Sequence, residues 1–347
     1  MKLPILLTML IFNQLTIAVG QQPIDTLTVV GVGDIMMGSN YGSGILPSGN
    51  GEGLMREVED ILKDADVTFG NLEGVLLNSG GTPKTCRDPK VCYVFRSPES
   101  YVDNLARAGF DILSIANNHA GDFGNEGRKS TMITLESAGI EFAGQLQKPW
   151  TVIERKGIRY GLVAFAPNSN CVNLNDIPGA KKLVAHVDSL SDIVIVSFHG
   201  GAEGPEYQHV LRKTEVFHGE NRGNVYQFAH EVIDAGADIV FGHGPHHTRG
   251  VEIYKNRFIA YSLGNFCTYG MNTTGVNGLA PIVKVFTSAS GEFFSALITS
   301  TDQSIRQKVK IDVENRALHR IQQLTKEDFP EIGVTISENG RIRKSTN

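Results

Sequence analysis

The chain has 347 residues, of which 41% are hydrophobic, and a formal net charge of −5 at pH 7. This length and apolar content suffice for the core of one large domain. The acidic balance and the lack of a basic cluster argue against a nucleic-acid partner. The sequence contains neither a phosphate-binding G-x-x-x-x-G-K-[ST] loop nor a G-x-S-x-G motif, so an NTP-driven ligase and a serine hydrolase are unsupported.

The first twenty residues predict a secretory signal peptide. Lys2 supplies the positive start, Leu3–Phe12 the apolar stretch and Ala18-Val19-Gly20 a small-residue cleavage site. Asn13 and Gln14 interrupt the apolar run, which is then too short to span a bilayer. A retained membrane anchor is the alternative. We therefore expect residues 1–20 to be a signal and the protein to be secreted, periplasmic or attached to the cell surface.

Strands and helices alternate in the first part of the chain. Runs of β-branched apolar residues indicate strands, and apolar residues three and four positions apart indicate helices. Ser97 as N-cap, with Pro98 after it, predicts a helix start, and Gly109 and Gly139 predict helix ends. In chain order we expect strands at Leu27–Val32, Asp66–Phe69 and Ile112–Ile115, helices at Leu54–Leu62, Pro98–Ala108 and Glu126–Ala138, and a Gly-rich loop at Ser39–Gly53.

Strands dominate the later part. We expect a hairpin at Val152–Glu154 and Arg159–Ala166, a helix at Lys181–Leu190, a strand at Ile193–Phe198, a long polar segment at Glu203–Asn224, a helix at Val225–Ala235 and a strand at Ile239–Phe241. A second hairpin at Val251–Tyr254 and Arg257–Ser262 and strands at Pro281–Phe286, Phe293–Thr299 and Gln307–Val313 follow; the polar tail from Lys326 has helix potential and then frays. This order predicts an α/β sandwich with two sheets in a single domain.

Four cysteines in an exported chain allow disulfides. Cys86 and Cys92 flank a polar loop and are the easier pair to join. Cys171 and Cys267 each follow a strand and could meet at the same sheet edge. No paired C-x-x-C occurs, so the spacing does not indicate zinc binding.

Polar side chains of metal-ligand type follow five of the predicted strands. They are Asp34, then Asn71 and Glu73, then Asn118, His119 and Asp122, then His199, and finally His243 and His246. Open α/β sheets bind their ligands at the carboxyl ends of strands, where these residues would gather. Taken singly, each has a structural alternative, such as the Asn- and Gly-rich turn at 116–122. The repetition along one edge favours a site for zinc, manganese or iron, with room for one or two ions.

Three further residues are candidates for binding an anionic substrate. Arg96, His209 and Arg222 carry the charge or donors that pair with carboxylates and phosphates. For each of them a solvated surface role is the alternative.

The ordered motifs carry a family resemblance. GD-x-M-x-G, GNLEG, ANNHAGD, FHGG, GHGPH and AYSLGNF, over residues 26–270, resemble the CapA (capsule, poly-γ-glutamate) family. That family is similar to calcineurin-like metallophosphoesterases and 5′-nucleotidases, so the resemblance implies a four-layer αββα sandwich over residues 24–300, followed by a strand and polar tail at 301–347. It also implies metal ligands at Asp34, Asn118, His199 and His243, and a charge-stabilising pair at His119 and Asp122.

The chain departs from the phosphoesterase pattern at three places. Met36 stands where the first motif has a histidine ligand. In the second motif Glu73 is the preferred substitute for the missing aspartate. In the last motif His246 lies one residue later than expected. The resemblance therefore leaves open a site with two ions, one ion or none.

The leading functional hypothesis is an exported metal-dependent hydrolase. A water held by metal on Asp34, Glu73, Asn118, His199, His243 and His246 would attack a phosphoester or an amide of an anionic polymer or ester. His119, oriented by Asp122, would act as an acid or stabilise the oxyanion. Two alternatives stay open: a non-catalytic polymer-binding or export component, and a small-molecule phosphoesterase. The expected partner is an anionic polymer or small molecule, with cell-surface association and no nucleic acid.

Overall fold

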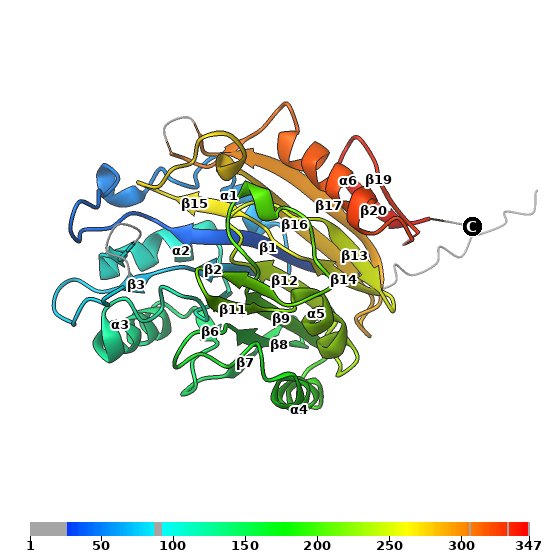
Figure 1. Ribbon diagram of the computed structural model, residues 1–347, viewed down its shortest axis with the longest axis horizontal. Coiled ribbons are helices and arrows are strands. Elements are labelled where there is room, and N and C mark those ends of the chain that lie inside the picture. Colours follow the sequence, from blue (N-terminus) through cyan, green and yellow to red (C-terminus); the bar gives the residue numbers. More distant parts are fainter. Residues whose placement is uncertain (1–25, 87–91, 305–306, 332, 346–347) are drawn as a thin grey trace, which may run out of the picture.

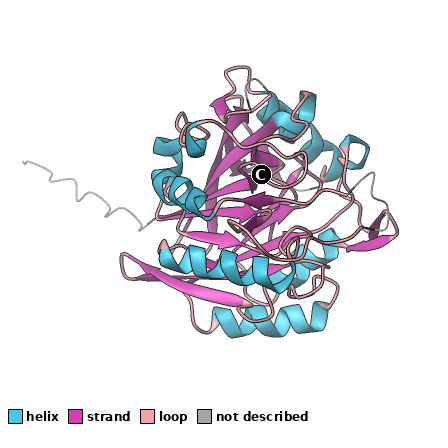
Figure 2. Ribbon diagram, turned by 90° about the vertical axis from the view of Figure 1, so that its left-hand side faces the viewer, coloured by secondary structure: helices cyan, strands magenta, loops and turns pink. Residues whose placement is uncertain are grey.

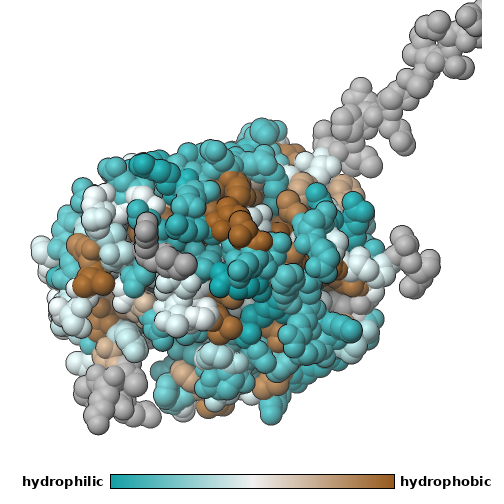
Figure 3. All heavy atoms as spheres, turned by 90° about the horizontal axis from the view of Figure 1, so that it is seen from above, coloured by the Kyte–Doolittle hydropathy of each residue, from teal (hydrophilic) through white to brown (hydrophobic). Residues whose placement is uncertain are grey.

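The computed structural model describes residues 26–86, 92–304, 307–331 and 333–345. The predicted signal peptide at 1–20 lies outside these ranges. Within them, no helix has the length and apolar character needed to cross a membrane. On the face shown in Figure 3, hydrophilic residues predominate and apolar residues form small separate groups.

The larger sheet has ten strands and carries the N-terminal strand at its centre (Figure 1). Its strands β1, β2, β5 and β6 run parallel, whereas β16 pairs antiparallel with β1. The ten strands are β1 (Leu27–Met36), β2 (Val67–Leu72), β5 (Ile112–Ser114), β6 (Glu141–Ala143), β15 (Asn265–Thr268), β16 (Leu279–Thr287), β17 (Phe293–Asp302), β18 (Lys310–Ile311), β19 (Val334–Ile336) and β20 (Arg341–Lys344).

The second sheet has six strands in the order β13-β14-β12-β9-β8-β7. Its four inner strands are parallel, and its edge strands β7 and β13 pair antiparallel with their neighbours. The six strands are β7 (Trp150–Arg155), β8 (Ile158–Phe165), β9 (Ile193–His199), β12 (Ile239–His243), β13 (Val251–Tyr254) and β14 (Arg257–Ala260).

The two sheets pack face to face with helices outside them (Figure 2). Phe69 and Phe241 stack across the interface with ring centroids 5.4 Å apart. The outer face of the larger sheet packs on α1 (Glu59–Lys63), α2 (Val102–Ala108) and α3 (Gly124–Ser137), and that of the smaller sheet on α4 (Ile177–Asp188) and α5 (Val225–Ile233). The predicted αββα sandwich of two mixed sheets is confirmed.

The helix predicted after Ser97 begins differently. Ser97 lies in β4 (Arg96–Ser97), which pairs with β3 (Val75–Leu76), and its Oγ donates to the carbonyl oxygen of Gly38 at 2.6 Å. Because that hydroxyl is already used, it does not cap the helix. A 3-10 turn, η3 (Glu99–Tyr101), precedes α2, and Gly109 ends α2 in the left-handed conformation with φ 91° as predicted.

The C-terminal region is more ordered than predicted. Helix α6 (Arg316–Asp328) lies mostly before Lys326, and β19 and β20 form a hairpin after it, so the expectation of a fraying tail is wrong. Leu318 and Ile321 of α6 enter the core between the sheets. No element was expected at 314–325, although the three-residue spacing of Leu318 and Ile321 is that of a helix face.

The cysteines and the long polar segment also take definite positions. Cys86 and Cys92 form the predicted disulfide. Cys171 and Cys267 are both buried as free thiols and form no disulfide with each other. The segment after Glu203 contains η4 (Pro205–Tyr207) and the hairpin β10 (Glu215–Phe217) and β11 (Glu220–Gly223); shorter 3-10 turns are η1 (Gly49–Gly51) and η5 (Gly275–Gly278).

Candidate metal centre

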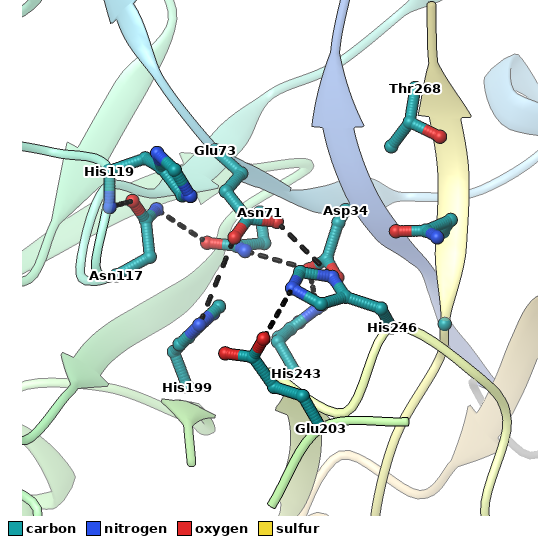
Figure 4. Close-up of polar contacts among 12 residues, drawn as sticks. Asp34, Asn71, Glu73, Asn117, His119, His199, Glu203, His243, His246 and Thr268 are labelled. Carbon is teal, nitrogen blue, oxygen red and sulfur yellow. Dashed lines mark hydrogen bonds and ion pairs between the residues drawn. The ribbon is translucent and has the colours of Figure 1, made fainter. Parts of the chain in front are cut away.

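The carboxyl ends of four parallel strands bring the candidate ligands together. Asp34 in β1 lies beside Asn71 in β2, and His243 in β12 lies beside His199 in β9. Because the two sheets face each other, these two pairs meet across the sandwich (Figure 4). The placement follows directly from the strand ends recognised in the sequence.

Asp34 is the centre of this arrangement. Its carboxylate is fully buried and accepts from Asn71 Nδ2 at 2.8 Å. His243 Nδ1 lies 3.2 Å from one carboxylate oxygen and His246 Nδ1 lies 3.1 Å from the other. Burial by itself raises the pKa of Asp34, but the hydrogen bonds and charges of the two histidines outweigh it and hold the pKa well below its ordinary value.

Glu73 is the second buried carboxylate. It follows β2, and its oxygens lie 3.9 Å from His199 Nε2 and 3.7 Å from His246 Nδ1. Burial raises the pKa of Glu73 to about 8; the charge of Asp34 adds to this increase and that of His246 opposes it. A neighbouring cation would remove the cost of ionising Glu73 beside Asp34.

His246 completes the group from a loop. It has a left-handed backbone with φ 64°, which turns the ring back over Asp34 although His246 lies three residues beyond β12. Burial lowers the pKa of His246, but Glu73, Asp34 and Glu203 outweigh it and raise the pKa to about 10. Asp34, Glu73 and His246 each offer a ligand atom within 4.8 Å of the others, so the three could hold a metal ion.

Buried atoms without partners support this reading. Several buried ligand-type atoms among the described residues have no hydrogen-bond partner, and those of the predicted ligands are Glu73 Oε1, Asn118 Oδ1, both ring nitrogens of His199, and His243 Nε2. Native proteins bury few such atoms, and an ion is one of the usual reasons. The carboxylate, amide and imidazole donors therefore fit a transition-metal ion.

The His119–Asp122 pair lies beside this group. His119 Nδ1 is 2.7 Å from Asp122 Oδ2, and the Asp122 side chain is fully buried. A chain of amides links the pair to Asp34, since His119 N donates to Asn117 Oδ1 at 3.1 Å and Asn117 Nδ2 donates to Asn71 Oδ1 at 3.1 Å. In Figure 4 the ring of His119 is directed toward Glu73 and Asn71.

Of the three predicted substrate-binding residues, one lies beside the metal-ligand group and two contact other residues. Arg222 is buried beside the group, where its Nη1 donates to Glu203 Oε1 at 2.8 Å. His209 Nδ1 instead lies 2.7 Å from Asp328 in α6, and Arg96 Nε donates to Asn40 at 2.7 Å. Within the described residues, neither His209 nor Arg96 contacts the metal-ligand group, and their substrate-binding roles stay predictions.

Asn118 has a less defined place than the other predicted ligands. Its backbone carbonyl accepts from Lys84 Nζ at 3.3 Å, and its side-chain oxygen has no hydrogen-bond partner in the described part of the chain. It is not one of the three residues whose ligand atoms lie close together. Its role as a ligand stays a prediction.

Two contributing residues, Asn117 and Glu203, were assigned no role from the sequence. Asn117 joins Asn71, already named at its strand end, in the amide chain to Asp34, and Glu203 Oε2 lies 4.0 Å from His246 Nε2. Asn117 follows a predicted strand, so the strand-end pattern could have included it. Glu203 lies four residues after His199 in a segment predicted only as polar, and its contact with His246 depends on the loop conformation.

The fold and this buried group together define an αββα sandwich protein with a candidate metal centre at its strand ends. The family model described as "Bacterial capsule synthesis protein PGA_cap" matches residues 28–269, and the chain belongs to that family. The resemblance seen in the ordered motifs is thereby confirmed.

Two curated relatives come from Bacillus. The chain is 27% identical over 263 residues to the capsule biosynthesis protein CapA of Bacillus anthracis, and the match covers 70% of this chain and 60% of that protein. It is 27% identical over 258 residues to the PGA biosynthesis protein CapA of Bacillus subtilis, covering 70% and 63%. The chain thus spans less than two thirds of the length of these relatives.

Solved structures of similar arrangement include a calcineurin-like phosphoesterase of Bacillus subtilis. The TM-score is 0.45 and the sequence identity 10%, with 87% of this chain and 98% of that one covered. Purple acid phosphatase from yellow lupin seeds has a TM-score of 0.40 at 11% identity, covering 82% and 53%.

Proposed function

We propose that this protein is an exported metal-dependent hydrolase of capsule-polymer metabolism, acting on an anionic polymer or ester. The observation that carries the proposal is the convergence of Asp34, Glu73 and His246, within 4.8 Å of one another, beside the hydrogen-bonded His119–Asp122 pair. Family membership supports the link to the capsule polymer.

Asp34, Glu73 and His246 would hold the metal, with His199 and His243 offering further ring nitrogens. His243 Nδ1 faces Asp34, which leaves Nε2 as the ring atom without a partner. The donor set suits zinc, manganese or iron, as one ion or two. Such an ion supplies a Lewis acid and lowers the pKa of a bound water.

His119 and Asp122 would handle protons. Burial lowers the pKa of His119, although Asp122 opposes this effect, so the imidazole is neutral near pH 7. Asp122 faces Nδ1 and therefore orients that N–H toward itself, which leaves Nε2 free to accept a proton and pass it to a leaving group. The buried carboxylate would then stabilise the resulting imidazolium.

The charge of the centre argues for a cation when the substrate is anionic. Asp34, Glu73 and Glu203 place three carboxylates around His246. Once all three are ionised, they would repel a polyglutamate carboxylate or a phosphate unless a cation offsets their charge. Binding of an anionic substrate should therefore depend on metal, whether or not turnover follows.

The first prediction concerns Glu73→Gln, which keeps the side-chain shape and removes the carboxylate charge. We expect metal affinity to fall by more than about 100-fold, since even outer-shell changes cost about 10–100-fold. Metal content is measured by elemental analysis, and turnover is measured with poly-γ-glutamate and with an aryl phosphodiester in the presence of zinc, manganese or iron.

Glu252→Gln is the matched control. Glu252 is also buried and faces a histidine, with His230 Nε2 at 2.9 Å, but it lies outside the candidate centre. This variant should keep both metal and turnover. A folded wild-type protein that takes up none of the three metals would contradict the proposal.

A non-catalytic polymer-binding component is the second candidate, and Met36 favours it. Met36 occupies the place of a histidine in the related first motif, is buried, and its Sδ accepts from Gly38 N at 3.3 Å. Metal-dependent polymer binding without turnover, retained in His119→Ala, would support this candidate. A small-molecule phosphoesterase ranks third and requires turnover of an aryl phosphate with at least one added metal.

A further inference from the structure

The segments on both sides of the Cys86–Cys92 disulfide converge on Asp122. On the N-terminal side, Lys84 Nζ lies 2.6 Å from Asp122 Oδ1, and Lys84 N donates to the Asp122 carbonyl at 2.7 Å. On the C-terminal side, Phe95 N donates to Asp122 Oδ2 at 2.6 Å. The carboxylate that orients His119 is thus held through both of its oxygens by the two arms of one disulfide-closed loop.

The same two arms contact His119. Lys84 Nζ is 3.3 Å from His119 Nδ1 and also donates to the Asn118 carbonyl at 3.3 Å. The Phe95 ring lies over the imidazole with centroids 4.2 Å apart and planes inclined by 30°. Phe95 therefore covers one side of the imidazole, and Lys84 places a cation beside its Nδ1 edge.

These contacts stabilise the charge of the buried Asp122 carboxylate. Asp122 has a fully buried side chain, and a buried carboxylate is costly unless it is paired and hydrogen-bonded. Lys84 provides the pairing charge, and its own side chain is 26% exposed. With Oδ1 taken by Lys84, Oδ2 is left for the Phe95 amide and His119. The 2.7 Å contact of Nδ1 with Oδ2 is shorter than its 3.3 Å contact with Lys84 Nζ, which favours the tautomer that carries its proton on Nδ1.

The disulfide joins these arms close to their contact points. Lys84 lies two residues before Cys86, and Phe95 lies three residues after Cys92. The two cysteines are 5.5 Å apart at Cα. Closing the loop covalently restricts the conformations of its ends, so both arms reach Asp122 together.

We propose that Lys84 is a positioning residue and that the segments at 84–86 and 92–95, joined by the Cys86–Cys92 disulfide, hold the His119–Asp122 pair in its working orientation. The inference rests on the proposed function, in which that pair handles protons. The disulfide and the residues beside it would then contribute to the chemistry of the centre as well as to the stability of the fold.

The test compares Lys84→Met with Cys86→Ser/Cys92→Ser in the full chain. Nitrogen-15 NMR of the histidine rings reports the tautomer of His119, whose signals are assigned by their loss in His119→Gln. We expect a single Nδ1–H tautomer in the wild type and a mixture in both variants. Turnover should fall by about tenfold, a part of the roughly 10²–10⁴-fold that a positioned acid or base contributes. Lys84→Arg should restore both readouts.

Lys148→Met is the control, because the Lys148 side chain is also 26% exposed and pairs with Glu141 at 2.9 Å away from this loop. An unchanged His119 spectrum in Lys84→Met would overturn the inference. The spectrum decides even if the wild type shows no turnover, so failure of the hydrolase proposal is a separate result. Should the double cysteine variant not fold, Lys84→Met, which keeps the disulfide, still decides.

Discussion

The pKa values of the buried carboxylates in this protein depend on the groups that surround each of them. Asp34 faces two histidines, and its pKa is held low although burial raises it. Glu73 has the same burial but weaker partners, and its pKa is raised to about 8. Asp34 is therefore ionised without a metal ion, whereas Glu73 needs a neighbouring cation to be ionised near neutral pH.

Asp238 shows how burial changes the pKa of a carboxyl group that lies away from the candidate metal centre. It lies just before β12, accepts from Val194 N at 2.8 Å and pairs with Arg257 Nε at 2.8 Å. Burial raises its pKa from 3.8 to about 6, against the opposing effects of those partners. The folded protein therefore keeps this proton between pH 4 and 6 while the unfolded chain loses it.

By linkage, the stability contributed at Asp238 is present below pH 4 and is lost as the pH rises through 6. Relative to Asp238→Asn, the wild type should lose up to about 3 kcal/mol of unfolding free energy over this range. Urea unfolding at several pH values measures the difference. Relative to Asp66→Asn, the wild type should instead lose unfolding free energy as the pH falls. Hydrogen bonds from Lys156 and Thr28 outweigh burial and lower the pKa of Asp66.

At the scale of elements, the centre depends on how closely β1 and β15 approach. They are parallel, with Asp34 beside Asn265, and Asp34 N donates to Gly264 O at 2.8 Å. A Cβ at Gly33 would lie 2.0 Å from Gly264 O, so only glycine allows this contact. The glycine of the GD motif is therefore required by strand packing, and it places Asp34.

Gly33→Ala should accordingly push β15 away from β1. We expect destabilisation at or above the upper end of the roughly 1–3 kcal/mol usual for overpacking, since the obstacle is backbone. Metal affinity should fall with it. Equilibrium unfolding and elemental analysis measure the two effects. Gly333→Ala, whose added Cβ would lie 3.6 Å from the nearest atom, should change neither; equal stability of the two variants would refute the packing argument.

For the whole molecule, the C-terminal helix is part of the core. The family match ends at residue 269, yet α6 packs on β16 and β17 and inserts Leu318 and Ile321 between the sheets. Ser300 Oγ also accepts from Leu318 N at 2.9 Å. The sandwich is therefore closed at this end by residues beyond the matched region.

A chain ending at Asn315 should lose its cooperative unfolding transition or become insoluble. Leu318→Ala is the milder version, expected to cost about 2–5 kcal/mol from the cavity it leaves. Thermal unfolding of the soluble protein measures the loss. Gln323→Ala, on the exposed face of α6, should be nearly neutral; a folded, fully stable chain without α6 would show that the helix is only an attachment.

The sequence by itself determined the sandwich, the strand ends and the candidates Asp34, Glu73, His199, His243 and His246. Buried strands leave a strong apolar pattern, and the carboxyl ends of parallel strands share one edge of the sheet. These are local signals combined with one general rule of topology.

Only the tertiary structure decided which of these side chains meet. Asp34 and His246 are 212 positions apart, and their contact depends on the left-handed backbone of His246. Lys84 belongs to no motif, and its contact with Asp122 joins residues 38 positions apart in the chain. Loop conformation and side-chain direction are set by packing between distant segments, and no periodicity in the sequence records them.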